Sequence, residues 1–289
     1  MIKERQFYQH LVAMMIPLVI QEIINFCVQM LDTVMVGSLG DAAVSAVTLA
    51  GQPYFIFNVF AFGLTSAGAV MISQYWGQKN IEKIKHIMSV MLWSVIVVSV
   101  LYMGACWLFP RQIIHIFASD EKLVELGVSY LQVVVVSYLL NGLSMWYFSS
   151  LSAKENVKIS AAVYTGSFFV NLICNYLLIY GKLGLPEWGL FGAGVSTMIS
   201  RVFMCLMLVI LFFRPRYSAY RKGFAQASVN RKDFVYQNKQ GWPLALQLGM
   251  ETAAFSLSSV MVGWIGTVSL AAHQVMLTIS QLGYMLYYG

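Results

Sequence analysis

Charge is what this sequence most conspicuously lacks. Of its 289 residues only 10% are Asp, Glu, Lys or Arg, while 59% are hydrophobic. A water-soluble domain of this size could not cover its surface with so few charged side chains. Several windows exceed the length of about 18 apolar residues that crosses roughly 30 Å of hydrocarbon as a helix. We therefore predict an all-α polytopic membrane protein.

Cysteine pairs and catalytic motifs are also missing. The four cysteines lie inside apolar segments, and the sequence contains no Cys-x-x-Cys or His-x-x-x-His spacing. Such thiols are typical of buried packing positions rather than of disulfides or metal sites. Nor does any nucleophile elbow, phosphate-binding glycine loop or catalytic-triad spacing occur. We predict that the protein is not an enzyme and uses no cofactor.

Hydropathy predicts seven membrane spans and the beginning of an eighth near residue 270. The seven are 11–38, 51–74, 87–109, 124–148, 159–181, 190–213 and 241–264. If the N-terminus is cytoplasmic, all 18 basic residues except Arg111, Lys122, Lys182 and Arg201 lie on the inner side. This is the positive-inside bias of a plasma (inner) membrane protein. It accounts for the net charge of +6, so no nucleic-acid partner is expected.

The sequence repeats itself at a spacing of 226 residues. Segment 17–21 (PLVIQ) matches 243–247 (PLALQ), and 34–37 (VMVG) matches 260–263 (VMVG). Repeated membrane units are typical of secondary transporters, whose substrate path runs between the copies. Because six helices separate the copies, we expect a parallel repeat with an axis along the membrane normal.

The repeat also predicts the domain organisation. We expect a six-helix amino-terminal lobe at 1–213, a basic cytoplasmic linker at 214–240 and the beginning of a carboxy-terminal lobe at 241–289. The second copy stops inside an apolar segment, so the remainder of that lobe is expected to be missing from this chain.

Two of the predicted helices carry matching polar stripes. Gln21, Asn25, Gln29 and Asp32 fall within about 80° of the first helix, and Gln247, Glu251 and Ser258 form the equivalent stripe of the seventh. Polar residues in a spanning helix usually face the bundle interior or a water-filled cavity. We predict that Asp32 and Glu251 line a wet internal vestibule, where H⁺ or Na⁺ neutralises them and biases the helix packing. Either acid is a candidate Na⁺ ligand.

Other polar groups fall on the fifth and sixth spans. Tyr164, Ser167, Asn171 and Asn175 share one face of the fifth, and Thr197 lies on the sixth. Single Ser and Thr residues in membrane helices commonly serve helix packing, whereas two amides are harder to satisfy in lipid. Glu22 is either a second acid of the same site or a contact to another helix. Arg201 must snorkel, face water or find a carboxylate.

Three motifs resemble those of MATE (multidrug and toxic compound extrusion) transporters, most of all the NorM-type branch. They are the run 32–40 (DTVMVGSLG), the segment 68–80 (GAVMISQYWGQKN) and the run 271–274 (AAHQ). The resemblance implies a twelve-helix exporter of two six-helix lobes that alternates between outward- and inward-open states. It would expel organic cations or amphiphiles in exchange for Na⁺ or H⁺.

The resemblance also assigns roles to individual residues. Asp32 matches the acid of the amino-terminal lobe, with Asn171, Asn175 and Thr197 as its polar partners. Glu251 matches the seventh-helix acid of the second lobe, and Tyr284 is an eighth-helix contributor. Asn175 stands where the proton-coupled, DinF-like members usually have Asp, and the acid expected from a tenth helix lies beyond Gly289.

Two alternatives to drug export stay open. A flippase for lipid-linked saccharides belongs to the same superfamily but would favour more basic residues in its cavity, where only Arg201 is a candidate. A non-transporting, truncated membrane protein is supported only by the abrupt end at Gly289. The expected partners are membrane lipid and small organic, cationic substrates.

Overall fold

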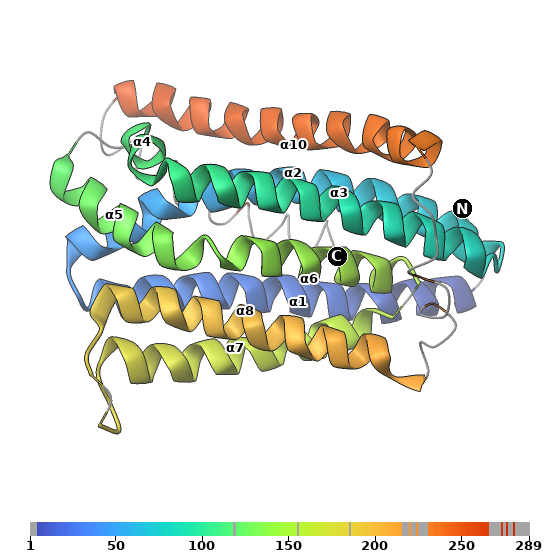
Figure 1. The fold of residues 1–289 in the computed structure, drawn as a ribbon, viewed down its shortest axis with the longest axis horizontal. Coiled ribbons are helices and arrows are strands. Elements are labelled where there is room, and N and C mark those ends of the chain that lie inside the picture. The colour runs from blue at the N-terminus through green and yellow to red at the C-terminus, as the bar shows by residue number, and fades with distance from the viewer. Residues whose placement is uncertain are drawn as a thin grey trace.

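A computed structural model of the chain (Figure 1) describes residues 5–117, 120–154, 156–184, 186–215 and 231–265, with Tyr220, Phe224, His273, Met276 and Ser280. Every regular element within these residues is an α-helix, as the composition predicted. The helices are α1 (Arg5–Gly37), α2 (Asp41–Gly77), α3 (Ile81–Leu108), α4 (Pro110–His115), α5 (Glu121–Val134), α6 (Ser137–Ser152), α7 (Val157–Ile179), α8 (Gly189–Phe213) and α10 (Arg231–Ile265).

The number of candidate membrane spans agrees with the predicted six-helix lobe. Five of the described helices are long and apolar enough to cross a membrane, and six spans result if the bent pair α5 and α6 counts as one. The seventh expected span, 241–264, is helical within α10. The eighth lies outside the described residues except for His273, Met276 and Ser280.

The fourth span differs from its prediction, because 124–148 was expected to be one continuous helix. It is instead two helices, α5 and α6, that meet at an angle of 51°. Their junction lies within the four consecutive valines 133–136, which lower helix propensity because their side chains are branched at Cβ. The Ser137 hydroxyl donates to the Val134 carbonyl at 2.5 Å. A side-chain bond of this kind competes with the regular helical ladder and favours a bend.

Two helices begin earlier than hydropathy indicated. α2 begins at Asp41 rather than at 51, directly after Gly40, whose φ of 106° is a conformation that favours glycine. α10 begins at Arg231, so residues 231–240 of the expected linker are helical. These residues are polar and basic, and a hydropathy window therefore stops short of them. The division into two lobes and a linker remains a prediction.

A short turn separates α2, which ends at Gly77, from α3, which begins at Ile81. The Asn80 side chain caps α3 by accepting from the Lys83 amide at 3.1 Å. A second turn, at 181–184, follows α7. Gly181 has a φ of 61°, and a Cβ there would come within 2.8 Å of the Glu187 amide nitrogen. Only glycine fits that position.

The helices pack as two groups joined by α6 (Figure 1). α7 packs against α8 and α1, while α2 packs against α10 and α3, and α6 contacts helices of both groups. A large hydrophobic cluster around Phe57, Leu131 and Tyr138 joins residues of α1, α2, α5, α6, α7 and α8. The Phe57 and Tyr138 rings stack with centroids 5.4 Å apart. α1, α7 and α8 are thereby held in contact, and the candidate polar residues lie between them.

Candidate functional site

Asp32 is half-buried near the end of α1, where α1 lies against α7. Its Oδ1 accepts a hydrogen bond from Asn175 Nδ2 at 2.5 Å. The same Nδ2 donates to Asn171 Oδ1 at 3.1 Å. Asn171 and Asn175 are one turn apart on α7 and are 1% and 0% exposed. The structure therefore brings together the acid and the two amides that the sequence singled out.

One atom of this pair of amides has spare bonding capacity. Asn175 Oδ1 is buried and has no hydrogen-bond partner among the described residues, while the Asn171 amide group faces Asp32. A buried polar atom without a partner costs free energy, which a bound group can recover. Carboxylate and carbonyl oxygens are the ligands that hard cations prefer. Asp32 with Asn175 Oδ1 could therefore hold a proton or a small cation.

The α8 residues divide between packing and the site. Ser196 and Thr197 donate to the carbonyls of Gly192 and Ala193 in their own helix, at 2.8 and 3.1 Å. These bonds fit the packing role that lone Ser and Thr often have. Thr197 in addition bonds to the phenol of Tyr130 on α5, which also lies within the field of Asp32. Sequence reasoning missed Tyr130, because nothing separates it from the other fifteen tyrosines.

The Arg201 guanidinium lies over an aromatic ring and acts electrostatically on a carboxyl group. Its Cζ lies 4.1 Å from the centroid of the Tyr54 ring of α2, a cation–π distance. Its charge also acts on Asp32. The centroid of the Tyr54 ring is 5.6 Å from that of the Tyr138 ring on α6, so the ring under the guanidinium is itself packed against a second aromatic ring.

The remaining polar residues of α1 lie one to three turns before Asp32, towards the middle of the helix. Glu22 is half-buried and bonds with Asn25, which in turn bonds with Tyr164 of α7. Gln21 is half-buried as well, and its Oε1 has no partner among the described residues. The Gln29 side chain lies outside the described residues. The partner of Glu22, Asn25, lies on the same helix, so neither of the two readings of Glu22 is decided.

The predicted second-lobe residues are not brought to this site. α10 packs against α2 and α3, and both Gln247 and Glu251 are exposed. Ser258 is half-buried, and Tyr284 lies outside the described residues. The sequence prediction for Glu251 consequently stays a prediction, since the helices expected to face it are not described.

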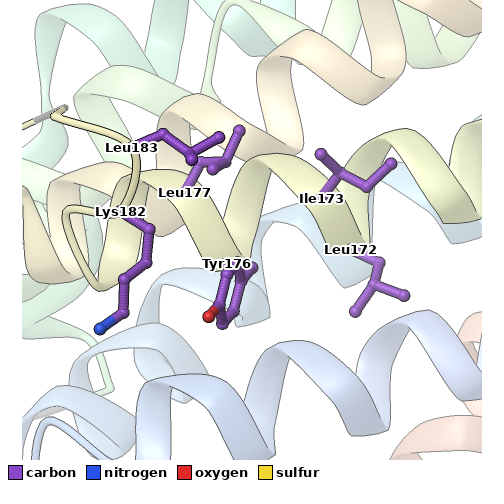
Figure 2. Close-up of a pocket in the computed structure, with 6 residues that line it drawn as sticks. All are labelled: Leu172, Ile173, Tyr176, Leu177, Lys182 and Leu183. Carbon is purple, nitrogen blue, oxygen red and sulfur yellow. The ribbon is translucent and has the colours of Figure 1, made fainter.

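A pocket of about 550 Å³ lies at the end of α7 and in the turn that follows it (Figure 2). Its lining consists of Leu172, Ile173, Tyr176, Leu177, Lys182 and Leu183. Ile173, Tyr176 and Leu183 are exposed, so this hollow opens on the outside of the bundle. It contains none of the predicted site residues, and its mostly apolar lining fits a lipid-facing surface better than a polar cavity.

Comparison with known protein families decides the classification. The model of the family described as MatE matches residues 17–177, which is more than half of the chain. The chain belongs to the MatE family. The match includes Asp32, Asn171 and Asn175, and it ends before Thr197 and Arg201.

Curated relatives and solved structures agree with the MatE assignment. "Probable multidrug resistance protein NorM" of Photorhabdus laumondii is 28% identical over 93% of this chain and 59% of its own length. The protein of the same name from Pasteurella multocida is 27% identical over 96% and 60%. The chain therefore spans about 60% of the curated relatives it matches.

Solved structures establish the MatE fold independently of sequence. A crystal structure of MATE in the bent conformation aligns with a TM-score of 0.85 at 20% identity, covering 96% of this chain and 62% of that chain. An outward-facing multidrug resistance MATE family transporter of the MOP superfamily aligns at 0.86 and 17% identity, covering 96% and 61%. At such identities the likeness concerns the fold alone.

Proposed function

We propose that the chain works as the amino-terminal lobe, with the first helix of a second lobe, of a secondary active multidrug exporter. The exporter is an antiporter that expels organic cations or amphiphiles in exchange for Na⁺ or H⁺ by alternating access. One observation carries the proposal: Asp32 accepts from Asn175, whose buried Oδ1 has no partner among the residues that the structure describes. The multidrug resistance named in the curated relatives supports the substrate class.

The proposed mechanism begins with the cost of the Asp32 charge. An aspartate costs about 2.5–3.5 kcal/mol at the centre of a membrane helix on insertion scales, and less near the end of a helix, where Asp32 lies. A proton or Na⁺ that neutralises Asp32 removes this cost, and Asn175 then loses an anionic acceptor. The packing of α1 against α7 thus has two electrostatic states, and a ligand can shift the balance between them only by its differential affinity.

The magnitudes indicate that Asp32 does not act alone. Moving an equilibrium from 1:99 to 99:1 takes about 5.5 kcal/mol, more than neutralising one such aspartate supplies. The membrane potential adds about 2.3 kcal/mol per charge for each 100 mV. A second acid would supply the rest, and Glu251 is the residue that we propose for it. The protein would lie in the inner membrane with its N-terminus in the cytoplasm.

The experiment that tests this function is ethidium efflux from proteoliposomes that contain the full-length transporter. Na⁺ and pH gradients are imposed separately, so that the coupling ion is identified by the gradient that drives efflux. An antiporter exports ethidium against its gradient under one of them and is silent when both are collapsed. Efflux that persists with both gradients collapsed, or that is absent under either, contradicts the proposal.

A further inference from the structure

Gln237 of α10 is completely buried, although it lies only six residues, about 9 Å, after the helix begins. A Cβ added at Gly68 of α2 would lie 3.2 Å from Gln237 Nε2, and it would also meet the Met91 side chain of α3. The glutamine therefore lies where α10, α2 and α3 meet. Neither its Nε2 nor its Oε1 has a hydrogen-bond partner among the described residues.

The amide of the next residue shows that the same contact can satisfy a polar group. Asn238 Nδ2 donates to Ser94 Oγ of α3 at 3.2 Å and to the Phe234 carbonyl at 2.8 Å. Gln237 makes no such bond within the part of the chain that the structure describes. A buried polar atom without a partner costs free energy, which contact with water would recover. The Gln237 amide thus destabilises the packing in which it is found.

Close packing of small residues acts in the opposite direction. Gly241 and Ala245 lie one turn apart on α10, against Leu64 and Gly63 of α2. A Cβ at Gly241 would come within 3.1 Å of Leu64 Cδ2. Small residues at this spacing let helix backbones approach closely, and such contacts stabilise helix pairs in membranes. The packing of α10 therefore combines a favourable contact with an unfavourable one.

We propose that Gln237 sets the balance between this packing and one in which α10 separates from α2 and α3 and the Gln237 amide reaches water. On the predicted topology α10 begins at the cytoplasmic side, where α2 ends and α3 begins. Separation there opens the inner side of the protein. The amide keeps the closed packing from becoming too stable to reopen. This inference rests on the proposed export function and names a residue that sets the balance of its alternating access.

Two glutamines of α10, one buried and one exposed, provide the test. Gln237→Met replaces the buried amide with an apolar side chain of similar length, and Gln240→Met is the matched control at an exposed position. Both are made in the full-length transporter with its native cysteines replaced. Spin labels are attached through Lys83→Cys of α3 and Lys239→Cys of α10, two exposed positions. Double electron–electron resonance in nanodiscs, with and without Na⁺ and at acidic and alkaline pH, measures how often the two helices are together.

Gln237→Met removes the cost of the unpartnered amide, so the ratio of packed to separated molecules should rise roughly tenfold or more. The melting temperature should rise as well. Gln240→Met should leave the ratio within about twofold of wild type, because residue 240 is exposed while α10 is packed. Equal ratios in the two variants overturn the inference, as does a wild type in which the helices are never found apart.

Stability gives an independent outcome. A lower melting temperature of Gln237→Met, or its failure to fold, would show that the amide makes a stabilising bond, and would overturn the inference. Ethidium efflux is measured separately on the wild type. If the ratio shifts as expected but the wild type exports no ethidium under either gradient, the proposed function fails and the role of Gln237 stands. If efflux is ion-driven but the ratio does not shift, export stands and the role of Gln237 fails.

Discussion

α1 and α10 are copies of one sequence pattern, and the structure surrounds them differently. Asp32 of α1 accepts from Asn175 and lies in the field of Arg201, whereas Glu251 of α10 is exposed. The difference comes from the neighbours: α7 and α8 present amides and a guanidinium to α1, while α10 lies on α2 and α3. A polar stripe on one helix becomes a site only where the facing helices provide partners.

α10 is attached to the first lobe through a different kind of contact, the close approach of small residues. A Cβ built on Gly63 of α2 would lie 2.4 Å from Ala245 Cβ, so the two helices approach as closely as small residues permit. Asn238 of α10 donates to Ser94 Oγ at 3.2 Å, which adds a polar contact with α3. α10 is therefore attached to the first lobe by close packing and a neutral polar contact, whereas α1 is attached through a hydrogen bond to the Asp32 carboxyl group.

The largest effect is expected for substitution of Asp32, the acid that distinguishes the surroundings of α1 from those of α10. Asp32→Asn in the full-length transporter should abolish ethidium resistance in cells, because the neutral amide cannot alternate between charged and neutral states. Resistance is measured as growth in ethidium, with expression checked by immunoblotting. Resistance that survives at normal expression would remove Asp32 from the mechanism.

A second substitution tests whether α10 depends on its close approach to α2. Gly63→Val should push α10 away and lower the melting temperature, at a cost of about 1–3 kcal/mol for overpacking. Gly51→Val is the matched control, since a Cβ at Gly51 of the same helix meets nothing within 4 Å. Equal melting temperatures of the two variants would show that the contact does not hold α10.

Glu251→Gln tests whether the second copy repeats the role of the first. We expect weaker ion-triggered release of ethidium, with some release remaining because Asp32 is intact. Stopped-flow release from the full-length protein after a Na⁺ or pH jump measures the effect. Release at the wild-type rate would show that the second acid has no part in coupling.

Loss of the Asn175 side chain sharpens the account of the first copy. Asn175→Leu removes the donor to Asp32, and hydrogen bonds to charged groups contribute about 1.5–3 kcal/mol. Charged Asp32 is then less stable, so its affinity for a proton should rise roughly tenfold or more, whereas Na⁺ also loses Asn175 Oδ1 as a ligand. Ser196→Ala is the control, because the Ser196 hydroxyl donates within its own helix. Equal proton affinities of Asp32 in both variants would deny Asn175 its role.

The smallest effect concerns the first lobe alone. Lys154, in the turn between α6 and α7, is 3% exposed, and burial lowers its pKa from 10.5 to about 8. The folded lobe therefore binds fewer protons at this site than the unfolded chain, and stability rises with pH from about 8 to 10.5. Between pH 7 and 9 the gain is about 1 kcal/mol. A Lys154→Met variant should lose this part of the pH dependence of thermal stability.

The sequence predicted the helical class and the number of spans in the first lobe, because hydropathy depends on one helix at a time. The meeting of Asp32 with Asn171 and Asn175 was implied by the resemblance to MATE transporters, since helical periodicity does not show which helices face each other. The bend between α5 and α6 was missed, because a hydrophobic run does not reveal where four valines interrupt a helix. Tyr130 and Tyr54 were missed for another reason: their roles depend on which helices face each other, and nothing local distinguishes them from other tyrosines.

The break in the fourth span places a joint inside the hydrophobic cluster around Phe57, Leu131 and Tyr138. Tyr130 precedes the 51° bend and bonds to Thr197, while Tyr138 follows it and packs beside Tyr54. The two tyrosines thus lie on different helices of one span, Tyr130 on α5 and Tyr138 on α6. A change of the angle between α5 and α6 would change the distance between the residues around Asp32 and those around Arg201, without unwinding any helix.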